Sequence, residues 1–181
     1  MLDIYFEVMR IFLIGYMGSG KTTVGRPLAK ALGLRFVDMD HHITDTHHKN
    51  IAQLFEELGE EGFRQLEQKT LQELSTQDNI VIATGGGAPC LFDNMDTMNR
   101  SGISIYLQVS PEGLAARLKH GCEKRPLLRG KSPEELLEYI RHTLSLREPY
   151  YRKARITVDC DGYSDAQVIE KCRRVVESMP E

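Results

Sequence analysis

The sequence predicts an α/β fold of three layers, in which helices cover both faces of a five-stranded, mostly parallel sheet. Short apolar segments with strand character alternate with helix-like segments, which is the order of successive βαβ units. A phosphate-binding motif lies between the first strand-like and the first helix-like segment. The 181 residues, 41% of them hydrophobic, suit one folded domain spanning residues 1–181. The predicted strands are residues 11–14, 35–38, 80–83, 103–107 and 156–159.

The phosphate loop, residues 15–22, reads Gly-Tyr-Met-Gly-Ser-Gly-Lys-Thr and matches G-x-x-x-x-G-K-[ST]. Its glycines let successive N–H groups point at a phosphate chain, and the following helix aims its positive end there. We expect Lys21 to reach the β- and γ-phosphates and the Thr22 hydroxyl to hold Mg²⁺. A plain glycine-rich turn is the alternative, but the flanking strand and helix favour binding of ATP or GTP. The predicted nucleotide contacts here are Gly18, Ser19, Gly20, Lys21, Thr22 and Thr23.

Composition narrows the expected partners and location. The formal net charge of −3 argues against a protein that coats nucleic acid, and no apolar run approaches the ~20 residues of a membrane span. Residues 1–10 lack the basic start of a signal peptide. The four cysteines form no C-x-x-C pair, so we expect free thiols in the cytoplasm. We therefore expect a cytoplasmic protein without nucleic-acid or membrane partners. We also expect a monomer, although nothing in the composition bears on the oligomeric state.

Two aspartates, Asp38 and Asp40, follow the second predicted strand. Ligands of parallel sheets bind beyond the carboxyl ends of the strands, and residues two apart on an extended backbone point the same way. One carboxylate could help to hold Mg²⁺ through water, and the other could accept a proton from a substrate hydroxyl. A helix N-cap in a solvated turn is the alternative. The position opposite the phosphate loop favours the site.

Further candidate site residues lie after the third predicted strand and in the predicted helix 60–75. Gly85-Gly86-Gly87 follows the third predicted strand, and three glycines suggest a backbone that approaches a ligand closely, with a flexible turn as the alternative. Arg64 lies near the apolar stripe of the predicted helix 60–75, at the helix start, where the dipole disfavours a cation. This mismatch favours an anion-binding role for Arg64, which Glu67 could orient.

A glycine-bracketed segment at about 121–131 precedes a capping box that begins at Ser132. We interpret this segment as a long loop between two helices. In a phosphotransferase such a segment is a lid that closes over the nucleotide, and Arg125 could then meet the transferring phosphate. An exposed basic loop is the equally good alternative.

Arg147 continues the apolar stripe of the helix that starts at Pro133, which points it to the buried side and suggests an inward anion. A favourable interaction with the helix dipole is the alternative. Glu148-Pro149 is expected to end this helix, and Pro27 is expected to cause a kink or a locally adjusted turn in the first one.

Taken together, these motifs resemble those of shikimate kinase, within the nucleoside-monophosphate-kinase-like group of P-loop folds. The matching segments occur in the family's order and cover nearly all of residues 11–161. Many NTPases share the phosphate loop, but the combination with D-x-D, F-R, triple glycine and R-P-L is specific. These segments are residues 14–25, 36–40, 62–64, 84–87, 125–128 and 147–151.

The resemblance implies ATP-dependent phosphorylation of the 3-hydroxyl of shikimate, in the pathway to chorismate and the aromatic amino acids. It also implies a sheet of order 2-3-1-4-5, with substrate-binding helices at about 40–75. Asp40 would bind the substrate hydroxyls and could act as the base. Arg64 and Arg147 would bind the carboxylate. The triple glycine, Gly85, Gly86 and Gly87, would lie beside the substrate.

For the nucleotide, the resemblance implies ATP as co-substrate and Mg²⁺ as cofactor. Thr22 would ligate the ion, with Asp38 contributing through water. Arg125 would be the arginine of the lid, and Arg117 would lie near the adenine.

Two other functions stay open. One is another small-acid kinase of the same fold, such as a gluconate kinase, against which the Arg64, triple-glycine and Arg147 set argues. The other is a GTP-dependent switch or nucleotide-binding regulatory module. Such a module would favour GTP through an N-K-x-D element, which the sequence lacks.

Overall fold

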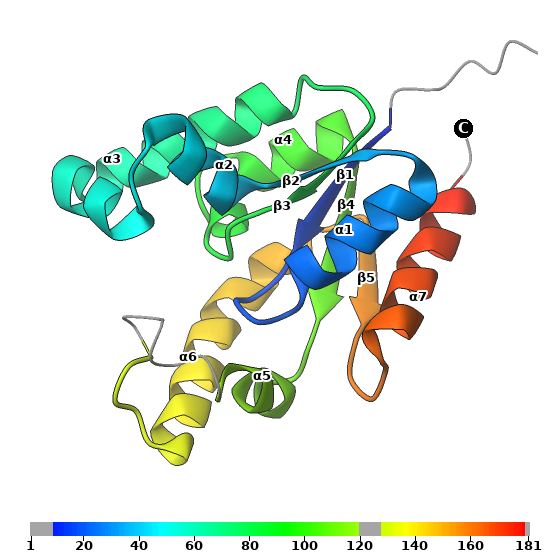
Figure 1. The fold of residues 1–181 in the computed structure, drawn as a ribbon. Helices are drawn as coiled ribbons and strands as arrows, with labels where there is room; N and C mark the ends of the chain where they lie inside the picture. The colour runs from blue at the N-terminus through cyan, green and yellow to red at the C-terminus, as the bar shows by residue number, and fades with distance from the viewer. Residues whose placement is uncertain (1–8, 120–127, 180–181) are drawn as a thin grey trace, which may run out of the picture.

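The computed structural model describes residues 9–119 and 128–179, which form one parallel sheet flanked by helices (Figure 1). The strand order is β2-β3-β1-β4-β5 and each neighbouring pair is parallel, which confirms the predicted sheet and its order. The strands are β1 (Arg10–Ile14), β2 (Arg35–Asp38), β3 (Ile80–Ala83), β4 (Ile103–Gln108) and β5 (Ile156–Asp159).

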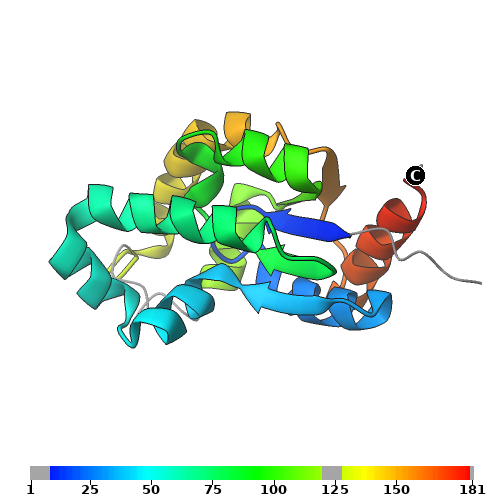
Figure 2. The ribbon, with the colours of Figure 1, turned by 90° about the horizontal axis from the view of Figure 1, so that it is seen from above.

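The helices are α1 (Lys21–Leu32), α2 (Met39–His47), α3 (Ile51–Leu74), α4 (Asn94–Ser101), α5 (Pro111–Leu118), α6 (Pro133–Tyr151) and α7 (Asp165–Glu177), with a short 3₁₀ helix η1 (Ala88–Cys90). α1 and α7 lie on one face of the sheet, and α4 and α6 lie on the other (Figure 2). This arrangement is the predicted three-layer fold. Within the described ranges, no helix has the length and apolar character needed to cross a membrane.

The core lies on both faces of the central strands β1 and β3. Ile11, Phe12, Leu13 and Ile14 of β1 have no exposed surface, and all of β3 is buried. A parallel sheet covered on both faces requires such continuous apolar strands. α1 packs closely here because Gly25 has no side chain: a Cβ at this position would lie 2.5 Å from the Phe36 ring.

One proline behaves differently from the sequence prediction, and another lies inside a helix without ending it. α6 does not end at Glu148-Pro149 but continues to Tyr151, where the N–H of Arg152 still donates to the carbonyl of Glu148, at 2.9 Å. Pro149 lies so near the helix end that its missing N–H removes only one of the last bonds. α1 also runs through Pro27 as one helix, and the carbonyl that lacks a donor belongs to the exposed Thr23.

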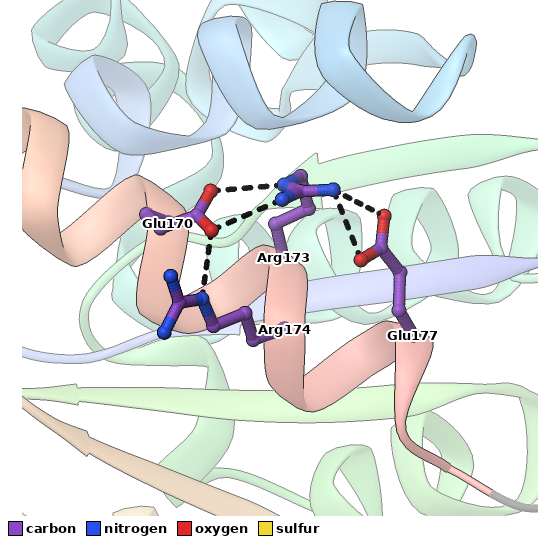
Figure 3. Close-up of polar contacts among 4 residues, drawn as sticks. All are labelled: Glu170, Arg173, Arg174 and Glu177. Carbon is purple, nitrogen blue, oxygen red and sulfur yellow. Dashed lines mark hydrogen bonds and ion pairs between the residues drawn. The ribbon is translucent and has the colours of Figure 1, made fainter.

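α7 carries a row of exposed ion pairs along its own surface (Figure 3). Glu170 accepts hydrogen bonds from Arg173 and Arg174, and Arg173 also donates to Glu177. These are i,i+3 and i,i+4 pairs, the spacing at which helical side chains meet. The bonds from Arg173 and Arg174 lower the pKa of Glu170 to about 2. The pairs support the helix that packs beside α1.

Candidate active site

The phosphate loop curls as its glycines permit. Gly15, Gly18 and Gly20 have φ values of 148°, 79° and 97°, a region that side chains rarely adopt. Lys21, the first residue of α1, turns back into the curl, and its Nζ donates to the carbonyl oxygens of Gly15 at 2.9 Å and Tyr16 at 3.0 Å. The loop therefore holds the ammonium group against its own backbone.

α5 covers the phosphate loop from the side. A Cβ on Gly18 would lie 2.9 Å from the side chain of Leu118, and Arg117 Nη1 donates to the Ser19 carbonyl oxygen at 3.0 Å. Arg117 thus contacts the phosphate loop directly. Its contact with the adenine stays a prediction.

Thr22, in the first turn of α1, meets Asp38 at the carboxyl end of β2. Thr22 Oγ1 donates to Asp38 Oδ2 at 2.5 Å, while Asp38 Oδ1 caps α2 by accepting from the N–H of His41 at 3.3 Å. Asp38 therefore serves as the N-cap that the sequence offered as an alternative and also lies beside the hydroxyl of the phosphate loop. Two neighbouring oxygens of this kind suit a hard cation such as Mg²⁺.

Asp40 belongs to the first turn of α2 and not to an extended segment, so the predicted reason for its direction was wrong. Its carboxylate nevertheless faces the same space as Asp38, because the helix begins at the strand end. Both line a cavity of about 380 Å³ that also contains Lys21, Thr22 and Gly86. The cavity joins the phosphate loop to the end of β3.

A pair of carboxylates flanks Gly85. A Cβ on this glycine would lie 2.8 Å from Glu67 Oε1 and 3.1 Å from Asp40 Oδ1. The surrounding protein disfavours the charged form of Asp40, and the negative Asp38 adds to this, so the pKa of Asp40 is raised. Burial likewise raises the pKa of Glu67. Gly85 has an ordinary φ, so what it provides is space for these groups.

Arg64 lies beside Glu67 and next to the glycine loop. Its Nη1 donates to Glu67 Oε2 at 2.6 Å, as the sequence predicted, and its guanidinium lies 5.5 Å from the centre of the Phe55 ring. Glu67 is only 3% exposed and holds Arg64 from the inside. A Cβ on Gly87 would lie 3.4 Å from Arg64 Nη1, so the guanidinium borders the glycine loop.

Arg147 of α6 completes the site from the opposite side of the glycine loop. Its guanidinium lies 5.5 Å from the centre of the Tyr16 ring, and a Cβ on Gly86 would lie 3.8 Å from its Nη1. Tyr16 in turn pairs its hydroxyl with Thr143 of α6 at 2.5 Å. Sequence reasoning missed this tyrosine, although its place in the phosphate loop was visible.

The structure thus brings two aspartates, two arginines and the glycine loop to the mouth of the phosphate loop. Arg125 lies outside the described residues. The predicted site residues that meet here are Gly18, Gly20, Lys21, Thr22, Thr23, Asp38, Asp40, Arg64, Gly85, Gly86, Gly87 and Arg147.

A family model described as shikimate kinase matches residues 17–177. The chain belongs to the shikimate kinase family. It is 51% identical to a shikimate kinase of Parabacteroides distasonis, over 84% of this chain and 88% of the relative. It is 42% identical to one of Bacteroides thetaiotaomicron, over 96% and 99% of the two chains.

Solved structures agree with this membership. A crystal structure of shikimate kinase from Bacteroides thetaiotaomicron has a TM-score of 0.88 at 40% identity and covers 94% of this chain and 99% of its own. The Acinetobacter baumannii enzyme in complex with shikimate has a TM-score of 0.84 at 37% identity, covering 94% of both chains. A gluconokinase from Sinorhizobium meliloti, at 19% identity and a TM-score of 0.62, shares the fold alone.

Proposed function

We propose that this member of the shikimate kinase family transfers the γ-phosphoryl group of ATP to the 3-hydroxyl of shikimate, giving shikimate 3-phosphate for chorismate and aromatic amino-acid synthesis. The observation that carries this is the meeting of Asp40, Arg64 and Arg147 around the glycine loop, at the mouth of the phosphate loop. Shikimate is a small triol with one carboxylate. One aspartate and two arginines are the complement of such a molecule.

The acid-binding role of the arginines follows from their surroundings. Arg64 and Arg147 border Gly87 and Gly86 respectively, so their guanidinium groups approach the loop from two sides. Planar guanidinium groups pair with a carboxylate through two parallel bonds. Glu67 orients Arg64 for this task and is buried behind it.

Asp40 is the group for the substrate hydroxyl. Its raised pKa makes the carboxylate a better proton acceptor than an ordinary aspartate, provided it is ionised at the working pH. The hydroxyl oxygen could then attack the γ-phosphorus while its proton moves to Asp40. The bond from the γ-phosphorus to the bridging oxygen breaks, and ADP leaves with that oxygen. Lys21, within the phosphate loop, would neutralise charge on the β- and γ-phosphates.

Mg²⁺ would be held by Thr22, with Asp38 contributing through water. The adjacent Thr22 and Asp38 oxygens fit this ion, which usually takes one or two protein oxygens together with waters and substrate phosphates. When bound, the ion would neutralise charge on the phosphates.

The lid at about residues 121–131, with Arg125, lies largely outside the described residues. Leu128, near its end, is wholly buried in the core. We propose that the lid closes over ATP and that Arg117 lies near the adenine. We also propose that the helices at about residues 40–75 bind the substrate. We also propose a single P-loop kinase domain that acts as a cytoplasmic monomer.

The test is ADP release from Mg²⁺-ATP with shikimate, with gluconate and with neither acid. We expect release that depends on shikimate. Release with gluconate alone would leave the phosphate chemistry and overturn the acceptor. No dependence on either acid would favour a nucleotide-binding regulatory module instead.

A further inference from the structure

Tyr151 is a buried tyrosine at the end of α6, one helical turn after Arg147. Its side chain has no exposed surface, and its ring lies 5.2 Å from that of Tyr106. The phenol hydroxyl donates to the carbonyl oxygen of Gly86 at 2.6 Å. Burial holds the pKa of Tyr151 well above its usual range, so the hydroxyl keeps its proton for this bond.

The guanidinium of Arg147 lies close enough to the same hydroxyl for its positive charge to act against the raised pKa of Tyr151. A guanidinium can only donate hydrogen bonds, and the phenol hydrogen is already donated to Gly86, so the phenol oxygen is a suitable acceptor beside Arg147. The phenol therefore contacts the glycine carbonyl and lies beside the guanidinium. On its other side, Arg147 lies over the ring of Tyr16.

The hydrogen bond from Tyr151 to Gly86 joins two elements that are far apart in the sequence. Gly86 belongs to the loop after β3, whereas Arg147 belongs to α6. The peptide unit is planar, so fixing the carbonyl of Gly86 also fixes the direction of the N–H of Gly87. The hydroxyl of Tyr151 thus fixes the direction of both polar groups of the peptide unit between Gly86 and Gly87.

We propose that Tyr151 is a positioning residue of the acid-binding site, which holds the Arg147 guanidinium and the Gly86 peptide in the arrangement that receives the carboxylated substrate. This inference rests on the proposed function, since it assigns Arg147 and the glycine loop to shikimate. The proposal differs from a simple core role because it requires the hydroxyl and not only the ring.

Tyr106 provides a matched control. It is 1% exposed and its ring is tilted against that of Tyr151, but it is a residue of β4 outside the acid-binding site. Replacing either tyrosine by phenylalanine removes one oxygen and keeps the ring. The two variants therefore separate a general effect of losing a buried hydroxyl from an effect on the acid site.

The experiment measures the KM values for shikimate and for ATP, kcat and the melting temperature for the parent, Tyr151→Phe and Tyr106→Phe. For Tyr151→Phe we expect the shikimate KM to rise roughly ten-fold, the size of one buried hydrogen bond, with the ATP KM changed less than about two-fold. For Tyr106→Phe we expect both KM values within about two-fold of the parent.

An unchanged shikimate KM in Tyr151→Phe, or a parallel rise of both KM values, would overturn the proposal. A second comparison makes the same substitution in an Arg147→Ala background, where its effect should shrink because the guanidinium to be positioned is gone. An undiminished effect would overturn the link to Arg147. A parent enzyme that shows no shikimate-dependent ADP release would overturn the proposed function, and that result is read before any variant is made.

Discussion

The proposed phosphate-binding and acid-binding regions of this protein lie side by side but are built in different ways. The phosphate region is local: Lys21 donates to backbone oxygens only five and six residues away. The acid region draws Asp40, Arg64, the glycine loop and Arg147 from four separate parts of the chain. The first is therefore shaped by backbone dihedral angles, and the second by the packing of α2, α3 and α6 around the sheet.

The two regions also differ in how they handle charge. The phosphate loop holds the ammonium group of Lys21 with neutral carbonyl oxygens. A negatively charged phosphate is a stronger acceptor and can take their place. In the acid region, Arg64 is already paired with the buried Glu67. Substitutions in the first should therefore affect turnover, and substitutions in the second should affect binding of the acid.

The largest effect should come from Lys21→Ala, which removes the one ammonium group of the phosphate loop. We expect kcat to fall at least about a thousand-fold, because stabilisation of transferring phosphate is mainly electrostatic. The melting curve should stay close to that of the parent. Lys30→Ala, at an exposed position of the same helix, is the control and should leave kcat unchanged. Near-normal activity of Lys21→Ala would refute the role of this lysine.

Arg147→Ala tests the acid region. The loss of a charge-assisted pair is worth about 2 to 3 kcal/mol, so the shikimate KM should rise roughly a hundred-fold while the ATP KM stays within a few-fold. Arg141→Ala removes a half-exposed arginine of the same helix, paired with Glu112, and should change neither value. If the ATP KM rose and the shikimate KM did not, the two regions would have been assigned the wrong way round.

A smaller effect distinguishes two glycines of one loop. In Gly85→Ala, the new Cβ would press on Glu67 and Asp40 at about 3 Å, and we expect kcat/KM for shikimate to fall roughly ten-fold. In Gly87→Ala, the nearest atom, Arg64 Nη1, is at 3.4 Å, an ordinary contact. We expect less than about a two-fold change there. Equal losses in both variants would show that the loop needs flexibility more than space.

The smallest effect concerns pH. Asp40 must be ionised to accept a proton, and its pKa is raised by burial and by the negative Asp38, so kcat/KM should fall with acidification at a higher pH than for an ordinary aspartate. Asp38→Asn removes the like charge and should move this acidic limb to lower pH, whatever its effect on the maximal rate. Asp45→Asn, on an exposed position of α2, is the control. If the acidic limb of the kcat/KM profile did not move in Asp38→Asn, Asp40 would not be the group whose ionisation sets that limb.

Much of the fold could be predicted because its signals are local and periodic. All five strands were found within one residue of their ends, since buried parallel strands are short apolar runs. α4 was missed because Asn94–Ser101 contains weak helix formers, and its helix depends on packing of Met95 and Met98 into the core. The end of α6 was misplaced because proline was given more weight than the packing of Tyr151.

The sequence by itself determined the alternation of strands and helices and the phosphate loop, because both depend on neighbouring residues and their dihedral angles. It also supplied the candidate residues of the acid site. Only the tertiary structure decided how these meet: that Asp38 caps a helix while touching Thr22, and that Gly85 makes room for two carboxylates. The link from Tyr151 to Gly86 spans 65 residues of sequence, and no local pattern encodes a contact that forms only when distant elements pack together.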